Sequence, residues 1–361
     1  MRLRRILLIA MLLLAGFSFA QLRGVRLSPQ SGAGSPFAKG RPTVLPLPFL
    51  RGEGRGEGST PDFNSVSVVE FSQRSLPGGS GHFVRIEGGL VVNEDELRTA
   101  RETDSHSSGT PNWTNAPGFE EDVFTFTRII FHSEPASRSG RGRLRWLGWW
   151  VDYPDADLNL SYRLQQLTSI RTDPDARVLK FTDPDLSRYP LLYIEHAGYM
   201  HLNDDELAAL RKYFLSGGAM LVNDFWGAEE WDGFAREINR VLPGRTWTEL
   251  NTDHPVFNCV YNLRGSMNRL QVPTIQFWNR AHDLVDPQLP LQTIFRGEGS
   301  EEMHVRALLD DHQRMMILAI HNSDVSDGWE REGEDEMYFR TYSERIAYPL
   351  GINIIFYLMT H

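Results

Sequence analysis

Residues 189–227 read YPLLYIEHAGYMHLNDDELAALRKYFLSGGAMLVNDFWG, and this stretch decides the fold. The apolar runs 190–194 and 219–222 predict two strands, and a helix between them begins at Asn203 and ends at Gly217. A strand, a capped helix and a second strand form a βαβ unit, whose strands lie parallel in a sheet covered by helices. Because parallel sheets bind ligands at the carboxyl ends of their strands, the stretch also indicates where a site lies.

The helix at Asn203 carries the strongest local signals in the chain. Asn203 and Glu206 have the spacing of a capping box, in which each side chain bonds the other residue's backbone N–H. Leu207, Leu210 and Phe214 form one apolar stripe, which predicts a buried face.

Apolar patterning on both sides of this unit predicts further strands and helices. The expected strands are 124–131, 177–181, 304–309 and 315–320, the last two joined as a hairpin through 310–313; the expected helices are 157–170, one between Asp224 and Pro243, and 346–358 with Pro349 in its first turn. Asp157 is the expected N-cap of the first of these helices. The chain therefore reads as an α/β protein with a mostly parallel sheet.

The N-terminus has the pattern of a secretory signal peptide over residues 1–20. A basic start precedes the apolar run 6–15, and the small residues Ser18 and Ala20 fit cleavage after Ala20. A retained N-terminal anchor is the alternative. We expect an exported protein, periplasmic or extracellular, that is not integral to the membrane once the signal is cleaved.

Three further segments follow the signal peptide. Residues 21–62 are rich in Gly, Pro, Ser and Arg and read as a low-complexity linker, because such a composition buries little apolar surface. Residues 63–119 form an N-terminal extension that the sequence assigns poorly. The main α/β domain spans 120–361.

Charge and cysteine content narrow the range of partners. Cleavage removes Arg2, Arg4 and Arg5 and takes the formal net charge from −10 to −13, which argues against nucleic acids and anionic membranes as partners. A partner protein of the cell envelope, a small-molecule ligand or a metal remains open. Cys259 is the only cysteine, so no intramolecular disulfide forms, and a buried apolar role is favoured over a reactive thiol.

Eight segments of the chain resemble a bacterial family of exported or membrane-associated proteins, the domain of unknown function family 4159. They are Phe124–Arg128, Trp150–Leu160, Tyr189–Tyr193, Leu215–Ala219, Asp224–Gly227, Asp253–Pro255, Ala347–Ile354 and Met359–His361. The resemblance covers about 120–361. It implies the class I glutamine amidotransferase-like fold, a flavodoxin-like three-layer α/β/α sandwich, and it implies no activity.

The amidotransferase mechanism does not follow from that resemblance. It needs a cysteine on a strand-to-helix elbow with small neighbours. Cys259 lies in the sequence Phe257-Asn-Cys-Val260 without a flanking glycine, and the elbow after the strand at 190–194 carries Glu195 and His196 instead. Glutamine hydrolysis is therefore set aside.

Several polar side chains are expected at the carboxyl edge of the sheet. The candidates for catalysis or for a metal are His196, Asp224 and His321; the candidates for binding are Asp152, Asp155, Glu195, Trp226 and His254. Histidine and carboxylate ligands suit zinc, whose catalytic sites combine about three such ligands with an open position. The competing interpretation is that Asp152 and Asp224 cap helices. The sequence identifies no cofactor.

Two other groups of residues have a structural and a functional interpretation. Trp146, Trp149, Trp150 and Trp226 suit a sugar-stacking surface or, more commonly, the core. The acidic run 324–336 resembles a calcium-binding loop only loosely, because it lacks the D-x-D-x-D-G spacing, and we expect a solvated loop.

Two functions remain open at this stage. One is a non-catalytic binding module of the cell envelope on an amidotransferase-like scaffold. The other is a hydrolase that depends on a metal or a carboxylate, with His196, Asp224 and His321 at its site.

Overall fold

A computed structural model describes residues 82–86, 91–105, 110–119, 122–133, 148–275 and 297–361. The predicted signal peptide, the predicted linker and Trp146 lie outside these ranges. Within them, the helices are all too short or too polar to cross a bilayer.

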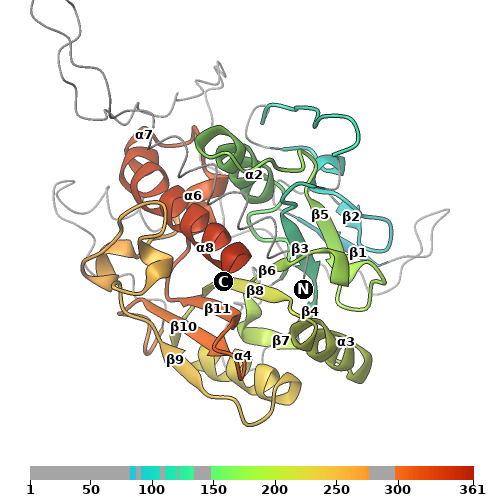
Figure 1. Ribbon diagram of the computed structural model, residues 1–361, viewed down its shortest axis with the longest axis vertical. Helices are drawn as coiled ribbons and strands as arrows, with labels where there is room; N and C mark the ends of the chain where they lie inside the picture. The colour runs from blue at the N-terminus through green and yellow to red at the C-terminus, as the bar shows by residue number, and fades with distance from the viewer. Residues whose placement is uncertain (1–81, 87–90, 106–109, 120–121, 134–147, 276–296) are drawn as a thin grey trace, which may run out of the picture. The chain divides into compact units, whose positions relative to one another are not determined.

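A seven-stranded sheet forms the centre of the described chain (Figure 1). Its strands in spatial order are β5 (Arg177–Lys180), β3 (Thr127–Ile130), β6 (Leu191–Glu195), β8 (Ala219–Phe225), β11 (Met315–His321), β10 (His304–Leu309) and β9 (Trp247–Glu249). The first five run parallel, and the last two are antiparallel to their neighbours. Numbered along the chain, the parallel strands have the order 2-1-3-4-5, which is the flavodoxin-like doubly wound order.

Helices cover both faces of this sheet and give three layers. Helix α2 (Asp155–Leu167) packs against α8 (Tyr348–Thr360), and α3 (Asp204–Leu215) packs against α4 (Gly227–Val241). Figure 1 shows the two pairs on opposite sides of the strands. The predicted α/β class with a mostly parallel sheet and a three-layer arrangement is therefore confirmed.

Short elements complete the described chain. They are β1 (Phe83–Arg85), β2 (Val91–Asn93), β4 (His132–Ser133), β7 (Met200–His201), the 3-10 helices η2 (Ala100–Glu102), η3 (Leu186–Arg188), η4 (Ala197–Tyr199), η5 (Pro255–Phe257) and η6 (Met267–Leu270), the helices α6 (Asp327–Glu330) and α7 (Glu336–Tyr338), and the π-helix η7 (Phe339–Ala347). The strands β1 and β2 pair with each other, as do β4 and β7.

The local signals of α3 are confirmed in detail. Asn203 Oδ1 accepts from Glu206 N at 3.0 Å, and Asn203 N donates to Glu206 Oε2 at 3.0 Å. Gly217, just past the helix, has φ +107°, a left-handed conformation that favours glycine. The predicted hairpin of β10 and β11 is also present.

The predicted start of α2 is wrong. The helix begins at Asp155, the N-cap position is Pro154, and no side chain caps it. Asp157 lies in the first turn of the helix and is fully buried, and its carboxylate accepts hydrogen bonds from Arg128. The buried guanidinium of Arg128, on β3, needs a negative counter-charge. Pairing with Arg128 therefore outweighs the tendency of an aspartate in this position to cap the helix.

The prediction of a solvated acidic loop is wrong for its first half. Asp324, Asp327 and Glu330 are at most 4% exposed. They are buried because α6 lies between two large helices: Trp329 O accepts from Asn159 Nδ2 of α2 at 2.8 Å, and its indole donates to the backbone ahead of α8. A Cβ added to Gly351 would lie 2.8 Å from the Trp329 ring, so only glycine permits this approach.

Candidate functional site at the carboxyl edge of the sheet

Strained backbone gathers at the carboxyl edge. Four non-glycine residues there have left-handed φ angles: Asp152 (56°), His196 (51°), Asp224 (50°) and Asn322 (63°). They lie in the turn before α2 and at the ends of β6, β8 and β11. This conformation costs free energy for L-residues with a Cβ, and such costs concentrate at functional sites. The backbone therefore supports the edge as the candidate site.

His196 and Asp224 meet at this edge, where His196 directly follows β6 and Asp224 lies near the end of the neighbouring parallel strand β8. His196 Nε2 lies 2.6 Å from Asp224 Oδ2, and the Trp226 indole donates to Asp224 Oδ1 at 2.6 Å. All three side chains are buried. A carboxylate this close to a ring nitrogen holds the imidazole in one orientation.

Neither Asp152 nor Asp224 caps a helix, so the capping interpretation is wrong for both. Helix α4 has its N-cap at Trp226 without a side-chain cap bond, and Asp224 bonds the indole and the imidazole instead. The Asp152 carboxyl also makes no cap bond to α2, and its buried Oδ2 has no hydrogen-bond partner in the described chain.

Glu195 belongs to a buried ionic cluster with Arg128 and Asp157. Arg128 donates to Asp157 Oδ1 at 2.9 Å through Nε and to Glu195 Oε1 at 3.1 Å through a terminal nitrogen. Its other terminal nitrogen donates to two backbone carbonyls, and Tyr193 Oη donates to Glu195 Oε1 at 2.5 Å. Burial raises the pKa of Glu195 to about 7, against the opposing charge and hydrogen bonds of Arg128.

His321 lies on the other face of the sheet. His321 pairs in register with Phe225, and the centroids of their two rings are 4.9 Å apart. The Phe225 ring also contacts Phe234 of α4, so both rings lie on the face of the sheet that α4 covers. Its Nε2 lies 2.9 Å from Gly227 O and its Nδ1 lies 3.2 Å from Arg306. Burial lowers the pKa of His321 to about 3. The structure thus brings His196 and Asp224 together and gives both nitrogens of His321 other neighbours.

The remaining predicted binding residues have separate surroundings. Asp155 is buried at the start of α2 and accepts from the Ser105 hydroxyl. His254 is the N-cap of η5, where its Nδ1 accepts from Val256 N at 3.3 Å, and its ring packs on Tyr357.

The described tryptophans agree with the core interpretation in two cases. Trp149 is fully buried and donates to Glu94 Oε1 at 2.5 Å, and Trp226 is 3% exposed. Trp150 is half-buried. Cys259 is half-buried, and burial raises the pKa of its thiol, as expected for an unreactive cysteine.

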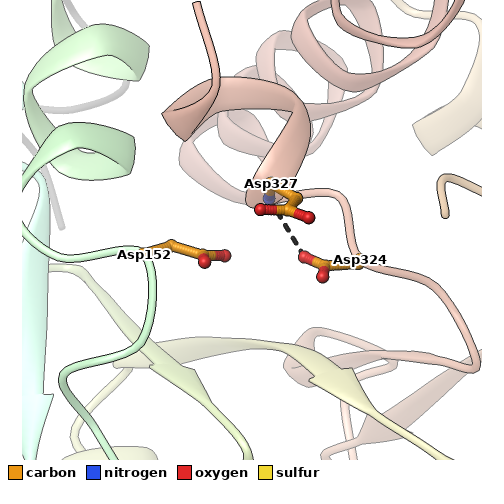
Figure 2. Close-up of side chains that lie close together, drawn as sticks. All are labelled: Asp152, Asp324 and Asp327. Atoms are coloured by element: carbon orange, nitrogen blue, oxygen red, sulfur yellow. Dashed lines mark hydrogen bonds between the residues drawn. The ribbon is translucent and has the colours of Figure 1, made fainter. Parts of the chain in front are cut away.

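Sequence reasoning expected the acids after β11 in a solvated loop and so missed that two of these aspartates face Asp152. Asp324 and Asp327, after β11, each offer a carboxylate oxygen within 4.8 Å of the others' (Figure 2). Asp327 N donates to Asp324 Oδ1 at 3.0 Å, and Asn223 of β8 holds the loop by donating to Ser326 Oγ at 2.7 Å. The apolar residues that alternate with these acids, Val325 and Trp329, were the available sign of burial.

The family model described as Domain of unknown function (DUF4159) matches residues 143–359. The chain belongs to this family. The match contains Asp152, His196 and Asp224 with the aspartates after β11, whereas β3 and Arg128 precede it. No curated protein matches the chain.

Proposed function

We propose that this member of the family is an exported, non-catalytic binding module of the cell envelope. The observation that carries the proposal is that the side chains of the predicted site are buried and already paired with other groups of the protein. Glu195 is held by Arg128 and Tyr193, His196 by Asp224, and His321 by Gly227 and Arg306. These side chains are at most 3% exposed. A general base must reach the proton that it removes, so such side chains suit a rigid scaffold better than a reaction centre.

The end of α8 supports the presence of a partner. Phe356 and Met359 are 37% and 44% exposed, and Val260, whose backbone N–H bonds Asn353 of the same helix, is 44% exposed. Exposed apolar side chains that lie close together are typical of protein interaction surfaces. A partner in the envelope would bury them.

A hydrolase is the alternative, and the pairing of His196 with Asp224 favours it. A carboxylate 2.6 Å from an imidazole nitrogen is the support that a general-base histidine needs. A metal- or carboxylate-dependent reaction would place its nucleophile or water near the other ring nitrogen.

Hydrolysis of p-nitrophenyl acetate and p-nitrophenyl phosphate by the purified protein separates the two functions. For a binding module, wild type and Asp224→Asn give the same background rate. A rate that falls at least tenfold in Asp224→Asn, while Asp205→Asn on α3 keeps the wild-type rate, would establish the hydrolase and overturn the module.

Cross-linking in intact cells tests the partner and the compartment together. A photo-reactive residue at Phe356 should trap an envelope protein, whereas one at Leu215, which is 66% exposed on α3, should not. N-terminal sequencing of the mature chain should begin at Gln21. An intact N-terminus in the cytoplasmic fraction would contradict export.

A further inference from the structure

Asp152, Asp324 and Asp327 face one another from two distant parts of the chain. We propose that these three carboxylates bind a divalent cation of the oxygen-preferring class, Ca²⁺ or Mg²⁺. This inference is separate from the proposed function, because it needs neither a reaction nor a partner. It also involves other residues than the histidines that the sequence suggested for a metal.

The burial of Asp152 is the first argument. The residue is 3% exposed, and its Oδ2 has no hydrogen-bond partner in the part of the chain that the structure describes. Figure 2 shows its carboxyl group pointing toward Asp324 and Asp327. Buried carboxylates in proteins are paired, hydrogen-bonded or bound to metals, so an oxygen aimed at two further carboxylates calls for a cation.

The local charge balance is the second argument. Arg331 contacts Asp327 at 3.2 Å, but it also contacts Glu330 at 2.5 Å and Glu334 at 2.9 Å. The single guanidinium of Arg331 thus faces several acids, and a bound divalent cation would neutralise the excess negative charge.

The donor set and its spacing are the third argument. Three carboxylate oxygens without sulfur or nitrogen suit hard cations and not zinc. The oxygens lie within 4.8 Å of one another. Opposite ligands of Ca²⁺ are about 5 Å apart and those of Mg²⁺ about 4 Å, so both ions fit this limit after small side-chain movements.

Hydrogen bonds fix two of the three ligands in place. Ile275 N donates to Asp327 Oδ2 at 2.7 Å, and Asp327 N donates to Asp324 Oδ1 at 3.0 Å. Such outer contacts orient carboxylates around metals. Asp152 comes from the turn before α2, so a bound cation would join that turn to the loop between β11 and α6.

Calorimetric titration of the EDTA-dialysed protein with Ca²⁺, Mg²⁺ and Zn²⁺ tests the proposal. Ca²⁺ or Mg²⁺ should bind with a stoichiometry of one ion per chain. Comparing the two titration curves shows which of these ions the site binds more tightly. Asp152→Asn, which keeps the shape but loses the charge, should weaken binding at least tenfold. The control Asp205→Asn removes an exposed acid of α3 and should bind as wild type does.

Three outcomes would overturn the proposal. They are the absence of binding by Ca²⁺ and Mg²⁺, undiminished binding by Asp152→Asn, and preferential Zn²⁺ binding that is lost in His196→Ala. If Asp152→Asn does not fold, Asp324→Asn serves in the same titration. Metal content after dialysis, measured by mass spectrometry, gives an independent stoichiometry.

Discussion

Two buried ionic clusters lie near the same sheet edge, and they differ in charge balance. In the first, Arg128 lies between Asp157 and Glu195, and each of its nitrogens donates a hydrogen bond. In the second, Asp152 faces the aspartates after β11. Glu195 Oε2 and Asp152 Oδ2 both lack a hydrogen-bond partner within the described ranges, but Glu195 Oε2 lies 3.1 Å from the Arg128 guanidinium, whereas Asp152 Oδ2 faces other carboxylates. The first cluster therefore reads as a structural element and the second as a site prepared for a ligand.

The difference between the clusters follows from the cost of burying charge. Removing an ion from water costs several kcal/mol, and only a well-placed counter-charge offsets that cost. In the first cluster, the guanidinium of Arg128 on β3 is the counter-charge for both Asp157 and Glu195. The second cluster contains Arg331, whose charge other acids already share.

The largest expected effect comes from removing the central charge of the first cluster. Arg128→Met leaves two buried carboxylates without their counter-ion and should lower the free energy of unfolding by about 3–5 kcal/mol. Denaturant titration at pH 7 measures this loss. Arg340→Met breaks an exposed pair with Glu336 and should change stability by about 0–1 kcal/mol. Equal losses in both variants would remove the distinction between buried and exposed pairs.

A smaller effect concerns the pH dependence of the first cluster. The folded-state pKa of Glu195, about 7, is above its usual value of 4.5, so the folded protein binds this proton more tightly than the unfolded chain does. The contribution of Glu195 to stability is therefore full below pH 4.5 and declines as pH rises to about 7, by about 3 kcal/mol. Glu195→Gln should flatten the unfolding free energy over this range. Identical pH profiles for both proteins would contradict the raised pKa.

The smallest effect is expected in the second cluster. In EDTA, Asp152→Asn should change the free energy of unfolding by less than about 1 kcal/mol, because it removes a buried acid whose Oδ2 has no hydrogen-bond partner in the described part of the chain. Asp157→Asn is the matched variant in the first cluster and should cost about 3–5 kcal/mol, because it breaks a buried pair. Urea titration of the two variants side by side compares them. A large loss in Asp152→Asn would show that the second cluster is balanced as well.

The parts of the fold that the sequence predicted are those with local signals. The capping box at Asn203, the glycine that follows α3 and the turn of the β10–β11 hairpin each depend on residues a few positions apart. The strands β6 and β8 were recognisable because both are short apolar runs on either side of that helix. Their parallel pairing then placed His196 beside Asp224.

The parts that escaped prediction depend on distant partners. Asp157 looked like a cap because its partner Arg128 is 29 positions away, and the acids after β11 looked solvated although Asn223, 103 positions earlier, holds their loop. The left-handed turns at His196 and Asp224 are set by the packed sheet, and neither residue is a glycine that would have signalled them.

The position of α6 has a consequence for the order of assembly. This single turn depends on the indole of Trp329, which bonds the backbone at Ala347 and lies against Gly351 in α8. Ribosomes synthesise a chain from its N-terminus, so the sheet strands are available before α8. We therefore expect the two aspartates after β11 to reach their final positions late in folding, when the closing helix docks.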